Sequence, residues 1–187
     1  MSDVNRIQED MGYVREVIER SEGGRGPSSI YYLWAAITLV GFSLADVAGP
    51  QVGLFWLVAG PLGGWLTYRL AKRANTRQGR LNRREGQRHA LHWNAMMVTI
   101  MLAIVPVATG TMNPEALSPL ILLIVAFSYF LAGVHLDRTV GWISILMIGG
   151  YFLVLFVPTY PWTITGVAVA AGLAISGFRL DRSREPA

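Results

Sequence analysis

Long apolar segments alternate with short polar ones from residue 30 to residue 178. Each segment holds close to the ~20 residues with which an α-helix crosses about 30 Å of hydrocarbon. Backbone polar groups inside a bilayer must be hydrogen-bonded within the chain, which favours helices. The pattern predicts an all-α integral membrane protein whose membrane domain covers residues 30–180. We expect six transmembrane helices in three hairpins, at residues 30–48, 52–70, 91–110, 118–135, 140–157 and 161–178.

Residues 1–20 show a different pattern, in which apolar positions follow one another at alternating intervals of three and four. This is the spacing of a heptad seam, and it predicts an amphipathic helix on the cytoplasmic side. A glycine-rich linker, SEGGRGPSS, follows at residues 21–29. The seam either docks a partner or a second copy, or packs on the protein's own cytoplasmic loops. It consists of Val4, Ile7, Met11, Val14 and Ile18.

Basic residues fix the expected orientation of the segments. Residues 69–90 carry eight Lys or Arg and a single Glu, and we expect them to form a loop. The turns at residues 49–51, 111–117 and 158–160 carry no Lys or Arg. Because Lys and Arg beside a span resist translocation, the basic side faces the cytoplasm. This predicts a multi-pass protein of the bacterial inner membrane, with the N-terminus and the tail at 181–187 both cytoplasmic.

Composition agrees with a membrane location. Hydrophobic residues make up 52% of the chain and charged residues 15%, whereas about 25% charged residues are usual in soluble domains. The absence of cysteine excludes disulfides, thiolate metal sites and a cysteine nucleophile. The basic residues lie at segment ends, which indicates anionic lipids at the cytoplasmic face, and not nucleic acid, as their partner. Candidate lipid- or anion-binding residues are Arg69, Lys72, Arg73 and Arg179.

Few ionisable residues fall inside the apolar segments, and such residues are costly enough to mark candidate functional sites. Asp46, near the outer end of the first segment, either binds a cation or relays a proton, or is simply hydrated. His92 opens the third segment and His135 closes the fourth, so adjacent antiparallel helices would bring them to similar depth. Two such histidines can ligate haem iron or a divalent metal, or can serve as polar anchors at the interface.

Motifs for a reaction do not accompany these residues. The sequence has no HExxH zinc motif, no G-x-S-x-G nucleophile elbow and no glycine-rich phosphate loop after a strand. Its apolar segments contain no Lys, which excludes a retinal-type Schiff base. We therefore expect no enzymatic activity, no catalytic residue and no cofactor, with haem as the alternative.

Two further patterns concern how the helices meet. The fourth and sixth segments end in the same motif, G-x-[HR]-L-D-R, at residues 133–138 and 177–182. The match indicates either an internal duplication or convergence on similar inner ends. Small residues at four-residue spacing let helix backbones approach closely, within the protein or against another membrane protein. They occur at Gly60 and Gly64, at Gly166, Ala170 and Ala174, and at Ala168, Gly172 and Ser176.

One segment carries a resemblance to other proteins. Residues 10–21 read DMGYVREVIERS, which fits D-x-x-x-[IV]-R-x-x-[IM]-E-R-S. This segment resembles the region before the first span in uncharacterised small bacterial six-span membrane proteins, a likeness that implies no activity. From the residues themselves we predict a non-enzymatic accessory or assembly subunit of a larger membrane complex. The alternatives are a small-solute transporter or substrate-binding membrane subunit, and a haem- or metal-binding protein.

Overall fold

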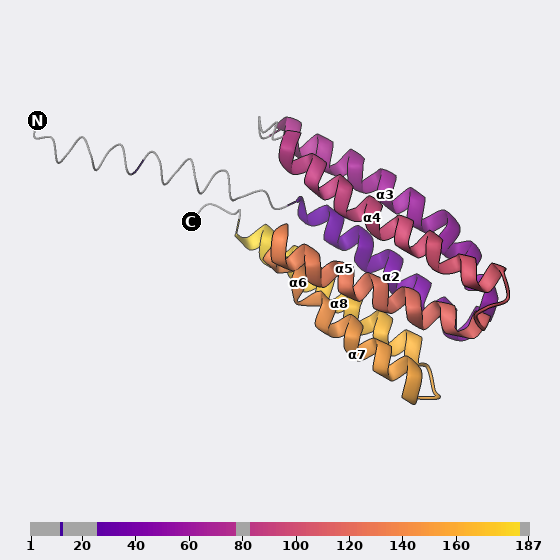
Figure 1. Ribbon diagram of the computed structural model, residues 1–187. Helices are drawn as coiled ribbons and strands as arrows, with labels where there is room; N and C mark the ends of the chain where they lie inside the picture. Colours follow the sequence, from indigo (N-terminus) through magenta and orange to yellow (C-terminus); the bar gives the residue numbers. More distant parts are fainter. Residues whose placement is uncertain (1–11, 13–25, 78–82, 184–187) are drawn as a thin grey trace, which may run out of the picture.

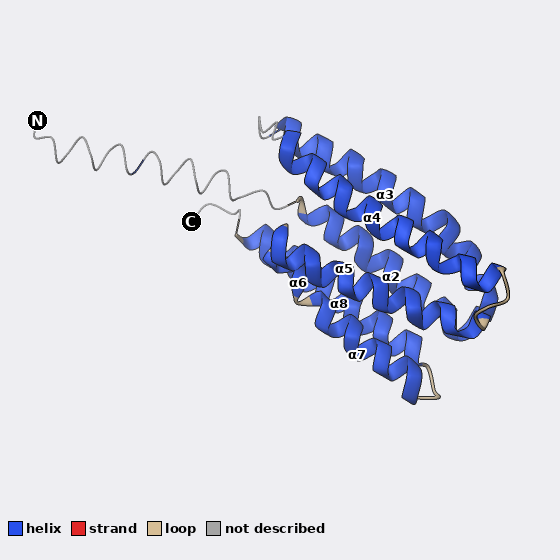
Figure 2. Cartoon of the chain, in the orientation of Figure 1, coloured by secondary structure: helices blue, strands red, loops and turns tan. Residues whose placement is uncertain are grey.

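The computed structural model describes residue 12 and residues 26–77 and 83–183. These residues form helices joined by short turns and contain no β-strand, which confirms the predicted all-α fold (Figures 1 and 2). Apart from residue 12, the helix predicted over residues 1–20 lies outside the described residues, and so does its whole seam. The elements are α2 (Ser28–Ala48), η1 (Gly49–Gln51), α3 (Val52–Arg77), α4 (Arg83–Ala108), η2 (Pro114–Ala116), α5 (Leu117–His135), α6 (Arg138–Gly141), α7 (Ile143–Phe156) and α8 (Pro161–Arg182).

Five segments are long and apolar enough to cross a membrane, and they coincide with five of the six predicted spans. They are Ser28–Ala48, Gly86–Ala108, Pro114–His135, Arg138–Phe156 and Pro161–Arg182. The remaining predicted span, at residues 52–70, lies in α3, a 26-residue helix whose four glycines, one proline and two tryptophans make it less apolar. These helices together indicate a multi-pass membrane protein.

The loop that we predicted over residues 69–90 is helical for most of its length, so this prediction is wrong there. α3 continues to Arg77 and α4 begins at Arg83, and residues 78–82 between them are outside the described part. Ala, Leu, Arg, Lys and Gln dominate this stretch, and all of them favour helix. Charge governs which side of a membrane a segment stays on but does not end a helix.

Four of the helices, α2, α5, α7 and α8, pack together and form the core of the bundle. α2 and α8 share the most extensive contact, and α7 packs against both α5 and α8. Ala126, Ile143 and Val169 in this core are fully buried. α3 packs mainly on α2 and α4 mainly on α5, so these two helices lie at the margin of the bundle (Figure 1). None of the residues in the apolar span of α4 is buried inside the structure.

Small residues let α8 approach both of its neighbours. A Cβ atom added at Gly166 would lie 2.7 Å from the Phe42 side chain on α2. One added at Gly172 would lie 2.7 Å from the Leu146 side chain on α7. Both small-residue faces of α8 therefore serve packing within the protein.

The glycine pair of α3 is used differently. A Cβ atom added at Gly60 or Gly64 would meet nothing within 4 Å. The neighbouring Gly63 instead packs on α2, because a Cβ atom there would lie 2.9 Å from Ile37 and 3.2 Å from Trp34. α3 therefore contacts α2 through Gly63, and its Gly60–Gly64 face has no cover from the described part of the chain.

The fifth predicted span is interrupted near its start. α6 is a single turn that ends at Gly141, and α7 begins at Ile143 after Trp142. The backbones of α5 and α6 touch here, since a Cβ atom added at Gly133 would lie 2.3 Å from the Cα atom of Gly141. The paired glycines allow the chain to reverse direction tightly after α5.

Candidate functional site

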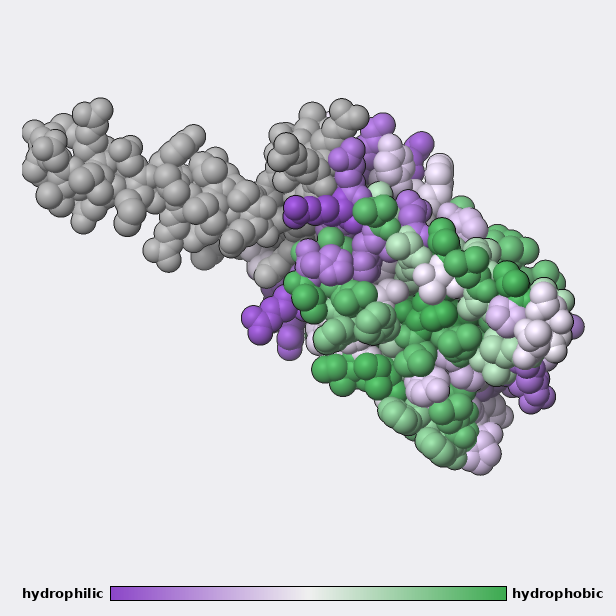
Figure 3. Space-filling model, in the orientation of Figure 1, coloured by the Kyte–Doolittle hydropathy of each residue, from purple (hydrophilic) through white to green (hydrophobic). Residues whose placement is uncertain are grey.

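Polar contacts between helices concentrate at one end of the bundle, where α2, α4 and α6 begin and α3, α5 and α8 end. Among the described residues, five pairs of side chains join separate elements towards this end: Tyr31 with Asp137, Tyr32 with Asp181, Trp34 with Thr67, His92 with His135, and Trp142 with Ser176. The described Lys and Arg side chains also lie at this end. Figure 3 shows polar surface gathered there and mostly apolar surface over the rest of the visible face. We refer to it as the basic end.

Two adjacent tyrosines at the start of α2 hold the basic end together. The Tyr31 hydroxyl donates to Asp137 Oδ2 at 3.0 Å, and the Tyr32 hydroxyl donates to Asp181 Oδ2 at 3.0 Å. Successive residues on a helix point about 100° apart, so one tyrosine reaches the turn before α6 and the other reaches α8. Each aspartate belongs to one copy of the L-D-R motif. The repeated motif therefore has a shared structural role, which is to bind α2.

Other parts of the repeated motif contribute to the same arrangement. Asp137 Oδ1 accepts a hydrogen bond from the backbone N–H of Thr139 at 2.9 Å and so caps α6. The motif glycine of α8, Gly177, lies against both tyrosines, because a Cβ atom there would be 3.1 Å from the Tyr32 ring and 3.2 Å from Tyr31. An added Cβ atom at Gly177 would require these two tyrosine side chains to shift.

A pocket of about 330 Å³ opens beside the Tyr31–Asp137 pair, between α2, α6 and α8. Its rim carries two exposed guanidinium groups, those of Arg138 and Arg179. Its remaining lining consists of Tyr31, Thr139, Trp142, Ser176, Leu180 and Ser183. This is the only hollow among those described that combines charged groups from two different helices, and we call it the arginine pocket.

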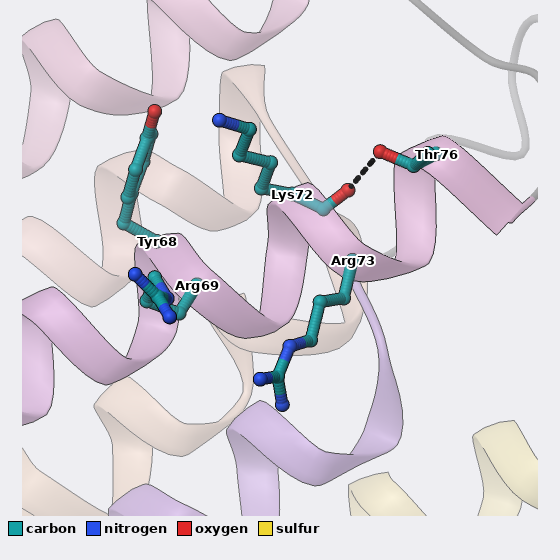
Figure 4. A pocket seen from close by; sticks show the side chains of 5 residues that line it. All are labelled: Tyr68, Arg69, Lys72, Arg73 and Thr76. Carbon is teal, nitrogen blue, oxygen red and sulfur yellow. Dashed lines mark hydrogen bonds between the residues drawn. The ribbon is translucent and has the colours of Figure 1, made fainter.

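The four residues predicted to bind lipid or an anion lie at two different places in the structure. Arg69, Lys72 and Arg73 line a shallow hollow with Tyr68 and Thr76, all on α3 (Figure 4). The side chains of Lys72 and Arg73 leave the helix in different directions, and the Arg69 guanidinium lies 5.0 Å from the centre of the Trp65 ring. Arg179 instead belongs to the arginine pocket. We call the α3 group the basic ridge.

The structure brings His92 and His135 together, as their positions in adjacent helices predict. His92 Nε2 lies 3.0 Å from the Ser128 carbonyl oxygen, and His92 Nδ1 lies 3.2 Å from His135 Nε2. A carbonyl oxygen only accepts, so His92 donates through Nε2; its Nδ1, when the ring is neutral, accepts from His135. Both nitrogens of His92 thus tie α4 to α5, and a metal or haem iron bound there would displace one of these bonds.

Asp46 lies at the opposite end of the bundle and joins α2 to the start of α8. Its Oδ2 accepts from the backbone N–H of Thr163 at 2.7 Å and from the Thr163 hydroxyl at 2.7 Å, and its Oδ1 lies 3.4 Å from the Trp162 nitrogen. The carboxylate therefore accepts from N–H groups in the first turn of α8 that have no acceptor within the helix. Its negative charge also interacts favourably with the positive end of the α8 dipole. Both oxygens act as a cap supplied by another helix.

Sequence reasoning missed the tyrosine pair and the arginine pocket. Tyr31 and Tyr32 show no motif of their own, and Arg138 is the arginine of the first L-D-R copy. The signal that was present is the repeat itself, which places an Asp at the end of two different helices. Metal-binding groups of three or more His, Cys, Asp or Glu residues are absent from the part of the chain that the structure describes.

The fold and its polar end define a multi-pass helical membrane protein. Comparison with known proteins adds no family to this class. No protein-family model matches the chain, and it has no significant match among curated proteins or solved structures.

Proposed function

We propose that the protein crosses the bacterial cytoplasmic membrane six times, as three hairpins, with both termini in the cytoplasm. Five helices of suitable length and apolar character support this arrangement. α3 supplies the sixth span, because its 26 residues extend over roughly 39 Å. The described basic side chains share one end of the bundle, which favours that end as the cytoplasmic one. Anionic lipids of the inner leaflet are then the nearest partners of the basic ridge.

Within the membrane, we propose that the chain acts as a non-enzymatic accessory or assembly subunit of a larger complex. The observation that supports this proposal is the structural role of three aspartates. Asp46, Asp137 and Asp181 each accept hydrogen bonds from another helix. We therefore assign them to stabilising the bundle, and not to catalysis or to binding a transported solute. The margin of the bundle supplies surface for a partner, since Leu54 and Leu57 of α3 and Leu102 of α4 are more than 60% exposed.

The heptad seam of residues 1–20 is the proposed cytoplasmic contact with another membrane protein or a second copy. We expect the triple variant Ile7→Asp, Met11→Asp and Val14→Asp to weaken this association more than tenfold, because burying each apolar side chain contributes about 1.5–3 kcal/mol. The membrane domain should stay folded. The measurement is the mass and composition of the complex purified in mild detergent.

A matched variant separates loss of the seam from added charge. Asn5→Asp, Gly12→Asp and Tyr13→Asp add the same charge at heptad positions away from the seam, and this variant should keep the wild-type complex. If the seam variant purifies with the same partner or oligomer mass as the control, the docking proposal is wrong.

A further inference from the structure

The side chains that line the arginine pocket differ in whether their hydrogen-bond donors already have an acceptor within the protein. The first group has one: Tyr31 donates to Asp137, Trp142 Nε1 to Ser176 Oγ at 3.1 Å, Ser176 to the Gly172 carbonyl, and Ser183 to the Leu180 carbonyl. The second group comprises the guanidinium groups of Arg138 and Arg179. Within residues 26–77 and 83–183, neither guanidinium has a hydrogen bond or an ion pair. Nearly all the available donors of the pocket therefore belong to two cations.

The charge of the pocket selects an anion. Two guanidinium groups contribute two positive charges, and the described residues of the lining include no carboxylate. The two aspartates adjacent to it in sequence accept hydrogen bonds elsewhere, Asp137 from Tyr31 and the Thr139 N–H and Asp181 from Tyr32. Guanidinium is planar and matches the oxygens of a phosphate group with paired hydrogen bonds. The Thr139 hydroxyl adds one further group beside the two arginines. A compact ligand rich in acceptor oxygens fits this set of donors.

We propose that the arginine pocket binds a phosphate group through Arg138 and Arg179, and that a phosphodiester lipid headgroup supplies it. The lipid source is favoured by what lies beside the pocket. Ile175, one turn before Arg179 on the same helix face, is 47% exposed, and Phe178 is 51% exposed. An acyl chain can lie along these side chains while its headgroup occupies the pocket. The lipid source rests on the proposed orientation, which places the basic end among cytoplasmic headgroups.

The basic ridge provides the contrast that makes the proposal specific. Its cations come from one helix, and Lys72 and Arg73 point in different directions (Figure 4). The Arg69 guanidinium already lies over the Trp65 ring. Such a surface attracts anionic lipid without fixing one phosphate group. The arginine pocket, in contrast, brings cations from α6 and α8 to the rim of one concavity. Removing two charges from each place should therefore have different consequences.

The test uses the purified full-length protein in a neutral detergent, with phosphatidylglycerol, diacylglycerol or inorganic phosphate added. Native mass spectrometry measures retained lipid, and thermal denaturation measures stabilisation. We expect wild type to retain one phosphatidylglycerol in preference to diacylglycerol, which lacks the phosphate group. Arg138→Gln with Arg179→Gln should weaken retention by more than tenfold, because each charge-assisted hydrogen bond lost is worth about a factor of ten. Lys72→Gln with Arg73→Gln should retain wild-type binding.

A conservative variant keeps the test valid if the double variant folds poorly. Arg179→Lys keeps the positive charge but loses paired hydrogen bonds to phosphate, so its affinity for phosphatidylglycerol should fall several-fold without a change in net charge. A further outcome is that only inorganic phosphate stabilises wild type and that this stabilisation is lost in the double arginine variant. This result would support the phosphate site and assign it to a free anion in place of a lipid.

Two results would overturn the proposal. One is equal retention of diacylglycerol and phosphatidylglycerol by wild type, which would mean that the phosphate group is not recognised. The other is an equal loss of binding in the pocket and ridge variants, which would mean that only overall charge matters. Both readouts use the isolated chain without a partner, so failure of the accessory-subunit proposal would leave the phosphate site unaffected, and failure of the phosphate site would leave that proposal unaffected.

Discussion

Replacing Gly133 with alanine is expected to lower the free energy of unfolding by about 1–3 kcal/mol or more, the usual cost of overpacking a tight contact. The added Cβ atom would lie 2.3 Å from the Cα atom of Gly141 and 2.9 Å from its nitrogen. Backbone, and not a flexible side chain, would have to move. Separation of α5 from α6 would also displace Asp137, which binds Tyr31 and caps α6. The midpoint of thermal denaturation in detergent measures the effect.

A matched glycine shows what the same substitution does without a clash. A Cβ atom added at Gly149 of α7 would meet nothing within 4 Å. Gly149→Ala should therefore leave stability unchanged or raise it by up to about 1 kcal/mol, since alanine favours helix over glycine. Equal melting temperatures for Gly133→Ala and Gly149→Ala would contradict the close backbone contact between α5 and α6.

Replacing Asp46 with alanine should cost about 1.5–3 kcal/mol, the range for hydrogen bonds to a charged group. The carboxylate accepts from both the backbone N–H and the hydroxyl of Thr163 at 2.7 Å, and alanine would leave the first turn of α8 without this acceptor. Asp46→Asn should cost less, because the amide oxygen still accepts but carries no charge for the helix dipole. The measurement is the midpoint of thermal denaturation, which should be highest for wild type, lower for Asp46→Asn and lowest for Asp46→Ala.

A double-mutant cycle isolates the contact from other effects of the change. Thr163→Val removes the hydroxyl bond to the carboxylate and keeps the backbone N–H, so it should cost about 1.5–3 kcal/mol in wild type, the range for a hydrogen bond to a charged group. In the Asp46→Ala background the same change should cost nearly nothing, because its acceptor is already gone. Additive effects of the two substitutions would show that the Thr163 hydroxyl is not bound to Asp46.

The helices that are long and apolar enough to lie in a membrane are predictable from the sequence. A lipid environment leaves an apolar segment of about twenty residues only the helical conformation, so the apolar segments at residues 30–178 predict helices directly. The proximity of His92 and His135 is predictable too, because consecutive membrane helices run in opposite directions and bring segment ends together. The extension of α3 and α4 into the basic stretch required helix propensity in addition to charge.

Contacts between distant helices are not predictable from this single sequence. The Tyr31–Asp137 bond joins residues 106 apart, and the Asp46–Thr163 bond joins residues 117 apart. Local patterns show which face of a helix is small or apolar, but they do not say which helix covers it. α8 has two small-residue faces, and only the structure assigns one to α2 and the other to α7. The arginine pocket follows from that assignment.

Orientation is the central claim, because it makes the basic end cytoplasmic and places the arginine pocket among inner-leaflet headgroups. The chain has no cysteine, so single cysteines introduced at Thr111, Thr159 and Gln78 give unambiguous labels. The measurement is reaction with a membrane-impermeant maleimide in intact cells and after permeabilisation. We predict labelling at Thr111 and Thr159 in intact cells, and labelling at Gln78 only after permeabilisation. Labelling of Gln78 in intact cells, or protection of Thr111 and Thr159, would contradict the account.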